Sequence, residues 1–465
     1  MRLLIVILFL FLSFNSFCQE KISLANQQAD LQQLYLALLA NHPKISTKAD
    51  SALLTAKYDS IIKQLHADAN QEEVINLFSK MVNSIGCGHT TLMPPLSGND
   101  ISALPIKLRY IEQKPIVVIS QKNIIPKGAE IIKINHDSIS ALVRKMDFLN
   151  SGVDNYNSAA KMQSIYDLIM YNSNYLYNAA KAVSIDYLWN NELKSKTIGF
   201  VTGDSMKYIL NDFDEDKMFP LYYFTDTSNK TIYIKLSIFM YDLTHPSTAE
   251  EMAKEMDEEE FDNVIIDLRG NGGGSIQFGS YFLGYFLKDS TYVFDNVELK
   301  KSAKDLFYKS FFNRIFYKSK ELPDSIPSKY ATFKKEEKDN NIYGFIAKQK
   351  INFSDKKIFV LIDKESFSMA PICAQLLKND GATIIGEEAG GRGYLNYAIV
   401  IKPYKLKKTK IRYYLPFFKG ETHAVADYNP TKNLMPNYYV TWTVDDVKNK
   451  VDPYIEKVKE LIKKK

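Results

Sequence analysis

Cysteine is scarce in this chain, with 3 Cys in 465 residues. So few thiols exclude a disulfide-stapled scaffold and any cysteine-rich zinc or iron–sulfur framework. A large excess of charge of one sign is also absent, because 59 Lys and Arg face 54 Asp and Glu for a net charge of +5. A dedicated nucleic-acid-binding protein normally carries a concentrated basic surface. We therefore expect no nucleic-acid partner.

Long apolar runs are lacking except at the N-terminus. Basic Arg2 precedes an apolar run, Leu3–Phe14, that is short of the roughly 20 residues a bilayer span needs. With small Ser16 and Cys18 behind it, this pattern predicts a secretory signal at 1–18, cleaved after Cys18. A lipid anchor on Cys18 is the alternative, and bulky Phe17 just before it disfavours that reading. We expect an exported chain, periplasmic or extracellular, without a transmembrane anchor.

What the chain does have is length for several domains and ample core material, with 30 Tyr and 27 Phe. Residues 19–100 read as a helical domain, because apolar residues recur there at helical spacing. The stripes are Leu31, Leu34, Leu38; then Leu54, Tyr58, Ile61, Leu65; then a helix capped by Asn70 with Glu73. Residues 101–150 read as short strands and 151–229 as a linker or cap region.

Residues 230–445 alternate strands with helices, which predicts an α/β fold with a parallel-rich layered sheet. Apolar strand segments stand at "TIYIKL", "NVIIDL", "KIFVLID" and "ATIIGE", and helices fall between them. Residues 298–350 interrupt this alternation as an insertion or lid. Residues 446–465 predict a C-terminal helix.

A glycine-rich loop follows one buried strand, in the segment "VIIDLRGNGGG" at 264–274. Glycines before a helix let backbone N–H groups approach a ligand at the positive end of the helix dipole. The loop suits phosphate or an oxyanion, but the spacing fits neither a P-loop nor a dinucleotide fingerprint. A strand–helix turn without ligand is the plainer alternative. We expect Asp267 and Arg269 to fix this loop by a charge-assisted bond.

Two further side chains suit acyl-transfer chemistry. Ser368 lies between a buried strand and a helix with Pro371 in its first turn, where a hydroxyl stands beside backbone N–H groups. It is also an ordinary helix-capping residue type. Of the 6 His, His89 lies in a glycine-framed turn after a helix. A structural role is the commoner one for such a residue, yet neutral imidazole is the natural base for a serine hydroxyl.

Together these segments resemble the C-terminal-processing and tricorn-type serine peptidases over roughly residues 70–440. "IIDLRGNGGG", "SFSMA" followed by "IIGEEAGG", "GCGHTTL" and "PKGAEIIKINHDSI" carry the resemblance. It implies a ClpP/crotonase-like core, an N-terminal helical domain and a degenerate PDZ-like strand module. It also implies Ser368 as the nucleophile and the backbone N–H groups of Gly272, Gly273 and Met369 as the oxyanion hole.

The base is where two branches of that family differ. The bacterial processing branch uses a lysine in a "GKG" segment, and this chain has Gly391-Arg392-Gly393 at that place. Guanidinium does not release its proton usefully. The resemblance therefore favours the tricorn-like branch, in which a histidine of the "GHT" segment is the base, here His89. For Arg392 two roles stay open: binding of a peptide's terminal carboxylate, or an ordinary solvated cation.

The orienting partners depart from the family pattern. Gly88 replaces a serine, Pro371 stands where an acid usually follows the nucleophile, and Pro430 or Thr431 fills the usual glutamate position. Nearby Asp427 and Glu421 are the candidate orienting acids. No His, Cys and acid cluster has metal-ligand spacing, so no metal or other cofactor is expected.

The resulting hypothesis is an exported serine peptidase acting on peptide or protein substrates. Its alternatives are a catalytically degraded peptide- or ligand-binding relative, and an acyl-group enzyme acting on esters or thioesters. The peptidase hypothesis requires a ring nitrogen of His89 to lie within or near hydrogen-bonding reach of the Ser368 hydroxyl. Cys87 and Cys373 either pair or remain buried thiols.

Overall fold

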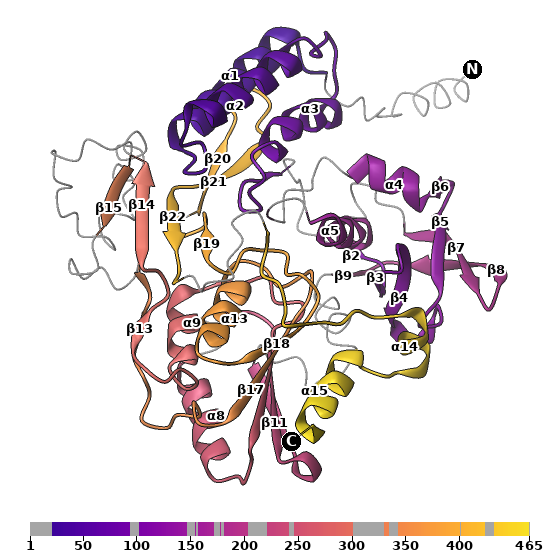
Figure 1. The fold of residues 1–465 in the computed structure, drawn as a ribbon. Helices are drawn as coiled ribbons and strands as arrows, with labels where there is room; N and C mark the ends of the chain where they lie inside the picture. Colours follow the sequence, from indigo (N-terminus) through magenta and orange to yellow (C-terminus); the bar gives the residue numbers. More distant parts are fainter. Residues whose placement is uncertain are drawn as a thin grey trace, which may run out of the picture.

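The computed structural model describes residues 21–93, 102–146, 154, 157–171, 177, 181–202, 221–240, 246–300, 330–333, 343–399, 401–423 and 432–464. The predicted signal at 1–18 and the candidate acid Asp427 lie outside the described residues. Among the helices of the described ranges, none combines the length and apolar character needed to cross a bilayer. Figure 1 shows a helical part above, a strand module at the right and an α/β core below.

The N-terminal part is built from helices α1 (Leu24–Asn41), α2 (Lys48–Ile62) and α3 (Gln71–Asn83). Their apolar stripes pack together as the spacing predicts: Leu31, Leu34 and Leu38 are fully buried. Asn70 caps α3 and forms a reciprocal capping box with Glu73. After α3 the short strand β1 (Leu92–Met93) pairs with β21 (Arg412–Pro416), and β21 pairs with β20 (Ile401–Lys405). This pairing ties the helical part to a late segment of the chain.

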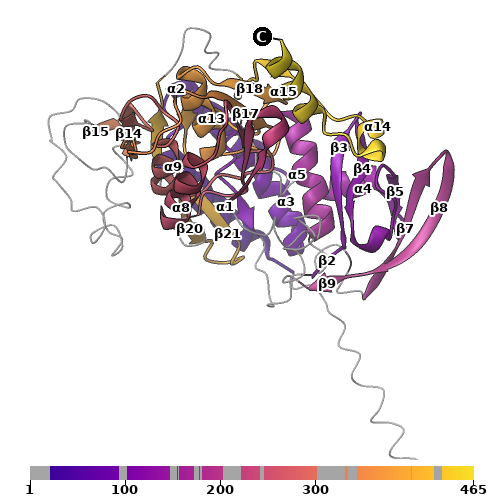
Figure 2. The ribbon, with the colours of Figure 1, turned by 90° about the horizontal axis from the view of Figure 1, so that it is seen from below.

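The strand module has the order β3-β4-β5-β7-β8, and Figure 2 shows it at one side of the core. Its strands are β3 (Ile106–Ile111), β4 (Lys114–Ser120), β5 (Glu130–Ile134), β7 (Ala182–Trp189) and β8 (Glu192–Gly199), with β6 (Asp137–Ser138) beside β5. Helices α4 (Ile139–Met146) and α5 (Ser158–Tyr171) share its apolar core. Strands β2 (Ser102–Ala103) and β9 (Val201–Thr202) pair next to it, and a short 3-10 turn spans Gln121–Asn123.

The module boundary predicted at residue 150 is therefore wrong. Strand β5 pairs with β7, so the sheet continues well into the region predicted as a linker or cap at 151–229. Alternation in β7 is clear in the burial pattern, where Val183, Ile185 and Tyr187 point inward. Because sequence pattern alone does not show which strand pairs with a distant one, the interruption by two helices concealed this continuity.

The core sheet has the order β10-β11-β12-β17-β18-β23. Strands β11 (Thr231–Leu236), β12 (Asn263–Asp267), β17 (Lys357–Ile362), β18 (Thr383–Gly386) and β23 (Tyr438–Tyr439) are parallel, and β10 (Leu221–Asp226) is an antiparallel edge after which a 3-10 turn spans Thr227–Asn229. The parallel-rich α/β sheet predicted from the alternation of strands and helices is confirmed.

Helices cover both faces of this sheet (Figure 1). Val264 and Ile266 of β12 face the large core shared with α8 (Pro246–Asp257), α9 (Ile276–Leu283) and α13 (Met369–Asn379). The intervening Ile265 faces α15 (Pro453–Lys463) on the other side. The predicted C-terminal helix at 446–465 is two helices, because α14 (Val444–Asn449) ends at left-handed Lys450 and α15 starts anew at Pro453.

A smaller sheet joins the core to the helical part in the order β15-β14-β22-β19. Its strands are β14 (Asn296–Lys300), β15 (Tyr330–Phe333), β19 (Leu395–Asn396) and β22 (Phe418–Glu421), and β13 (Thr291–Tyr292) pairs separately with β16 (Phe345–Ile346). Much of the predicted insertion at 298–350 lies outside the described residues. Its described ends are strands that pair with the main body.

Candidate active site

The glycine loop is held open by the asparagine inside it. The Asn271 side chain donates to the Leu236 carbonyl at 2.8 Å and accepts the Gly273 N–H at 2.8 Å. Gly273 has φ of +98°, in the left-handed region that favours glycine. Helix α9 then begins under the N-cap Ser275, whose hydroxyl accepts the Phe278 N–H. The sequence therefore forms the strand–loop–helix predicted for this segment.

The predicted charge-assisted bond at the base of the loop is present. The Arg269 guanidinium donates to the Asp267 carboxylate, with Nε to Oδ1 at 3.0 Å, and also to Asp452 of the C-terminal segment. Burial raises the pKa of Asp267, but Arg269 and Lys235 outweigh it and hold that pKa well below its usual range. These side chains fix the loop.

Ser368 stands on a sharp turn between β17 and α13. Its backbone has φ of +57° and ψ of −111°, and its side chain makes no capping hydrogen bond to the helix that follows. A non-glycine residue in that region costs of order 1–3 kcal/mol and persists where its surroundings over-determine it. Here the Ser366 hydroxyl donates to the Leu268 carbonyl at 2.8 Å, and the Phe367 N–H donates to the Asn271 carbonyl at 2.9 Å. The turn is thus fastened to the glycine loop through both Ser366 and Phe367.

The glycine loop and the Ser368 turn touch. A Cβ placed on Gly273 would lie 2.5 Å from the Ser368 Cβ and 2.8 Å from the Met369 backbone nitrogen. The amide of Gly273 donates to Asn271, so it is engaged within the loop. Within the described residues no hydrogen bond is recorded for the amides of Gly272 or Met369. Of the three amides predicted for the oxyanion hole, those of Gly272 and Met369 therefore remain candidates.

A pocket of about 160 Å³ adjoins Ser368. Its lining residues include Ile276, Phe294, Met369, Ile372, Ala398 and Ile399. Gln277 and Asn396 add polar groups at the same pocket. Most of the surface that faces this cavity is polar, so the cavity suits a polar group of modest size.

His89 lies against the residue that precedes Ser368. Its ring stacks on Phe367 with centroids 4.5 Å apart, and 9% of the residue is exposed. Neither ring nitrogen has a hydrogen-bond partner in the described part of the chain, so His89 is adjacent to the Ser368 turn without being bonded to its hydroxyl. Burial lowers the pKa of His89 to about 4, against the opposing charge of Asp154. The imidazole is therefore neutral at pH 7, with a lone pair to accept a proton.

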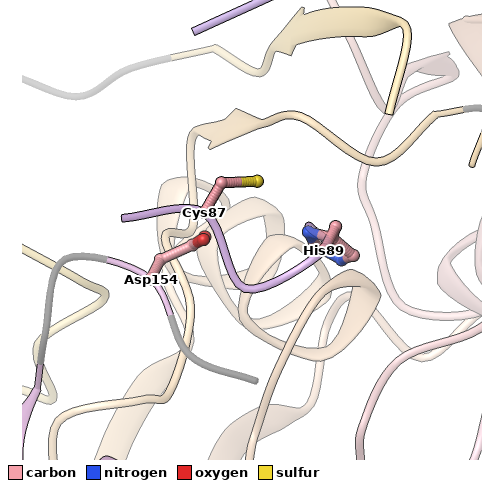
Figure 3. A group of neighbouring side chains, drawn as sticks. All are labelled: Cys87, His89 and Asp154. Carbon is pink, nitrogen blue, oxygen red and sulfur yellow. The ribbon is translucent and has the colours of Figure 1, made fainter. Parts of the chain in front are cut away.

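Asp154 is a buried acid that lies close to His89, and the sequence reasoning missed it. It is 4% exposed, and its Oδ1 accepts the Gly88 N–H at 2.9 Å. Figure 3 shows it facing the turn that carries Cys87 and His89; one ligand atom from each of the three lies within 4.8 Å of the others. "SGVDNYN" carries no motif, and the acid lies 65 positions from the histidine (154 − 89). Only the fold brings them together.

The fold also holds Asp154 firmly at its backbone. Its N–H donates to the Gly390 carbonyl at 3.0 Å, and its carbonyl accepts from the Asn433 side chain at 3.1 Å. Both partners belong to the segments after β18, in the α/β core. A group with His, Cys and acid atoms at close range thus exists, although the linear spacing predicted no metal-ligand cluster.

The remaining candidates are engaged elsewhere. Glu421 of β22 pairs with Lys419 at 2.6 Å and accepts from Asn296 at 3.1 Å. Arg392 is 6% exposed, which rules out the solvated cation, and its guanidinium carbon lies 5.9 Å from the Tyr397 ring centroid. Cys87 and Cys373 are both buried free thiols.

The strand module contacts the Ser368 turn through charges. Lys107 of β3 pairs with Glu365 at 3.1 Å, and Arg109 pairs with Asp363 at 3.2 Å and with Glu365 at 3.4 Å. Burial raises the pKa of Glu365, and the two cations outweigh that effect and lower it. Asp363 Oδ1 in turn accepts the Gly270 N–H at 2.9 Å. The module therefore supports the same turn that carries the nucleophile candidate.

Comparison with known proteins gives a family match and a shared fold. The model of peptidase family S41 matches residues 230–425, which include the glycine loop and Ser368 but not His89 or Asp154. No curated protein matches the chain. A crystal structure of mature CPAF has 15% identity and a TM-score of 0.65, covering 95% of this chain and 97% of that one. Its complex with lactacystin has 14% identity and a TM-score of 0.66, over 95% and 98%.

A putative peptidase from Parabacteroides merdae is also similar, with 12% identity and a TM-score of 0.50 over 94% of this chain and 96% of that one. At such low identities these structures establish the fold and nothing finer. The layered α/β arrangement with an N-terminal helical region is the one these structures share with the chain.

Proposed function

We propose, on the premise of the match between residues 230–425 and peptidase family S41, that this chain is a serine peptidase with the following mechanism. Ser368 is the nucleophile, His89 is the general base, and the amides of Gly272 and Met369 form the oxyanion hole. The observation that carries the proposal is the fastening of the Ser368 turn to the glycine loop. That contact supports the proposal because it packs the Ser368 side chain and the Met369 amide against Gly273, next to a pocket.

The chemical steps follow from these groups. As the Ser368 oxygen attacks the peptide carbonyl, its proton passes to a ring nitrogen of His89, and the carbonyl oxygen becomes an oxyanion held by the amides. The imidazolium then gives its proton to the departing amine, which leaves an acyl-enzyme. Water repeats the sequence in reverse order and frees the acid and Ser368.

We propose that the His89 ring rotates to do this. In the present arrangement its ring lies flat against Phe367 and its nitrogens are unpartnered. Rotation about the side-chain torsions toward Ser368 exchanges that stacking for two hydrogen bonds, one to the hydroxyl and one to an acid. Catalytic contacts are often loose before substrate binds and tighten in the complex.

Asp154 is the acid that we propose to orient the ring. It is buried, it already raises the pKa of His89 against the effect of burial, and it is anchored by Gly88 next to the histidine. A carboxylate in that position selects the tautomer and stabilises the imidazolium formed in the reaction. It takes the part for which the sequence offered Asp427 or Glu421.

The substrate is a peptide or protein, as the family match implies. Because the pocket beside Ser368 is about 160 Å³ and the surface facing it is mostly polar, we propose that the residue before the cleaved bond is polar and of modest size. A fluorogenic peptide panel that varies this one residue among Ala, Leu, Asp and Lys tests the preference.

Export is part of the proposal. The basic Arg2 and the apolar Leu3–Phe14 support a cleaved signal and a periplasmic or extracellular peptidase. Expression of the full chain followed by sequencing of the mature N-terminus tests it. A start at Gln19 is expected, and an uncleaved Met1 in the cytoplasm contradicts it.

The central experiment compares the mature chain with Ser368→Ala. We expect peptide hydrolysis to be lost while the melting temperature stays near that of the parent, because the substitution removes one oxygen from a half-buried side chain. Hydrolysis that survives the substitution contradicts the assignment.

A second candidate function is peptide or ligand binding without turnover. The unpartnered nitrogens of His89 are the observation in its favour. A fluorophosphonate probe separates the two functions, since covalent labelling of Ser368 needs an activated hydroxyl. Labelling supports the peptidase; an unlabelled but folded protein supports the binder.

A further inference from the structure

Cys87, His89 and Asp154 form a compact group of metal-ligating atoms from three different chemical classes. One sulfur, one ring nitrogen and one carboxylate oxygen lie within 4.8 Å of one another, and all three residues are buried (Figure 3). Cys87 has no part in the proposed mechanism. The position of Cys87 beside His89 therefore has no explanation in that mechanism.

The histidine supplies an independent sign that the group awaits a ligand. His89 is 9% exposed, yet both of its ring nitrogens lack a hydrogen-bond partner in the described part of the chain. A buried polar atom left without a partner costs of order 1–3 kcal/mol. One of these nitrogens lies inside the cluster, beside the sulfur and the carboxylate. Coordination of a metal ion would satisfy it.

The anchoring of the other two ligands also fits a site. The Asp154 carboxylate is fixed through Oδ1 to the Gly88 N–H at 2.9 Å, between the two ligands of the turn. Second contacts of this kind orient metal ligands in proteins. Burial and the charge of Asp154 raise the pKa of Cys87 to about 11, so the cluster holds a thiol until a cation displaces its proton, as metal binding to cysteine does.

Thiolate, imidazole and carboxylate together are the donor set of zinc and its chemical relatives. Around a tetrahedral zinc ion these donors lie about 3.5 Å apart, given bonds of about 2.0–2.3 Å. Starting from separations of up to 4.8 Å, each side chain needs to move by about 1 Å or less. The fourth position is left to water.

We propose that Cys87, His89 and Asp154 bind Zn²⁺ or a similar thiophilic divalent cation, and that the bound ion switches the peptidase off. Binding replaces the thiol proton: Cys–SH and M²⁺ give Cys–S–M⁺ and H⁺, with the proton released to solvent. The metal takes the lone pair by which His89 would accept the Ser368 proton. It also occupies the carboxylate that orients the ring.

Charge supports the ion in this place. The thiolate and carboxylate together balance a divalent cation. Lys44 is the nearby cation that opposes it, but its Nζ is directed to the Gly86 carbonyl at 2.8 Å. The inhibitory part of the inference rests on the proposed function, whereas metal binding itself does not.

Cobalt tests the site without reference to activity. The mature chain is treated with chelator, kept reduced with a phosphine, and titrated with Co²⁺ while its near-ultraviolet and visible absorption is recorded. We expect a thiolate-to-cobalt charge-transfer band in the parent chain and in Cys373→Ala, and no such band in Cys87→Ser. Cys373 is the matched control, because it is the other buried free thiol among the described residues.

Zinc inhibition of peptide hydrolysis is measured on the same proteins. We expect Cys87→Ser to keep its basal activity and to need about tenfold more zinc, or more, for half-inhibition, as loss of one ligand implies. A chelator should restore the activity of the parent chain.

The outcomes separate the two claims. A folded parent chain without the cobalt band overturns the site, and the band together with undiminished hydrolysis overturns the switch. Equal zinc sensitivity in Cys87→Ser and the parent chain overturns the role of the thiol. If metal-free protein hydrolyses nothing, the proposed function has failed, and the cobalt band of the parent chain still decides the site, even if Cys87→Ser does not fold.

Discussion

Replacing Gly273 by alanine tests the close approach between the glycine loop and the Ser368 turn. The added methyl would meet the Ser368 Cβ at 2.5 Å, the Met369 nitrogen at 2.8 Å and the Phe367 carbonyl oxygen at 2.9 Å. All of these lie at or beside the proposed nucleophile, and two of the contacts are with backbone. The clash can be relieved only if the loop and the turn separate.

The magnitude follows from two costs. An alanine held at φ of +98° loses about 1–2 kcal/mol of stability, and overlap in a packed site adds about 1–3 kcal/mol. Separation of loop and turn also displaces an oxyanion donor, which lowers kcat by about 10²–10³-fold. We expect Gly273→Ala to melt lower and to be nearly inactive at a temperature where it is fully folded.

Gly270→Ala is the matched control, since Gly270 has φ of +70° but an added methyl there meets nothing within 4 Å. It should lose stability through backbone strain alone and keep its kcat. Both variants are assayed with a fluorogenic peptide below their unfolding transitions, which are followed by circular dichroism. If folded Gly273→Ala retains half of the parent kcat, the loop is not an oxyanion-hole element that depends on this contact.

Three further outcomes are expected. Burial lowers the pKa of His89 from 6.5 to about 4, so His89 destabilises the folded state only below pH 6.5, by an amount that reaches about 3 kcal/mol below pH 4. The free energy of unfolding of His89→Gln should therefore lack this pH-dependent component. Identical pH curves for the variant and the parent chain contradict the prediction. Asp154→Asn should lower kcat about a hundredfold or more with little change in KM. It should also move the acidic limb of the pH–rate profile to lower pH, because Asp154 raises the pKa of His89. If the limb does not move, Asp154 has a structural role alone. Glu387→Gln should lower the free energy of unfolding in denaturant by about 3 kcal/mol, because Glu387 and Lys364 form a buried ion pair at 2.9 Å. The exposed control Glu250→Gln should leave the denaturant midpoint unchanged. Equal midpoints for the two variants refute the expected loss for Glu387→Gln.

Local patterns in the sequence predicted what local physics controls. The capping box of Asn70 and Glu73 depends on residues three apart, and it is present. The apolar run before Gly270 forms a fully buried strand, as its continuous hydrophobicity indicates. The helix after Ser368 begins at Met369, with Pro371 in its first turn, where a missing N–H is tolerated. These features are set within a few residues of one another.

What escaped prediction depends on contacts between distant segments. Asp154 reaches His89 only because Gly390 and Asn433, far along the chain, hold its backbone. The pairing of β5 with β7 crosses two helices, so the strand module outran its predicted boundary. The amide of Gly273 is bound by Asn271, a side chain inside the same motif, and no spacing rule distinguishes that amide from its neighbour. The periodicity of apolar residues along the sequence does not show which distant segments pair.

The salt bridges from Lys107 and Arg109 to the acids before Ser368 bear on how the protein can be divided. Asp363 has a fully buried side chain, and Arg109 is its cationic partner across the junction. A fragment reduced to the family-matched residues 230–425 would remove the Arg109 counter-ion of that carboxylate at the base of the Ser368 turn. The Ser368 segment therefore depends on the strand module, and a graft that carries the segment alone would lose the ion pairs that support its turn.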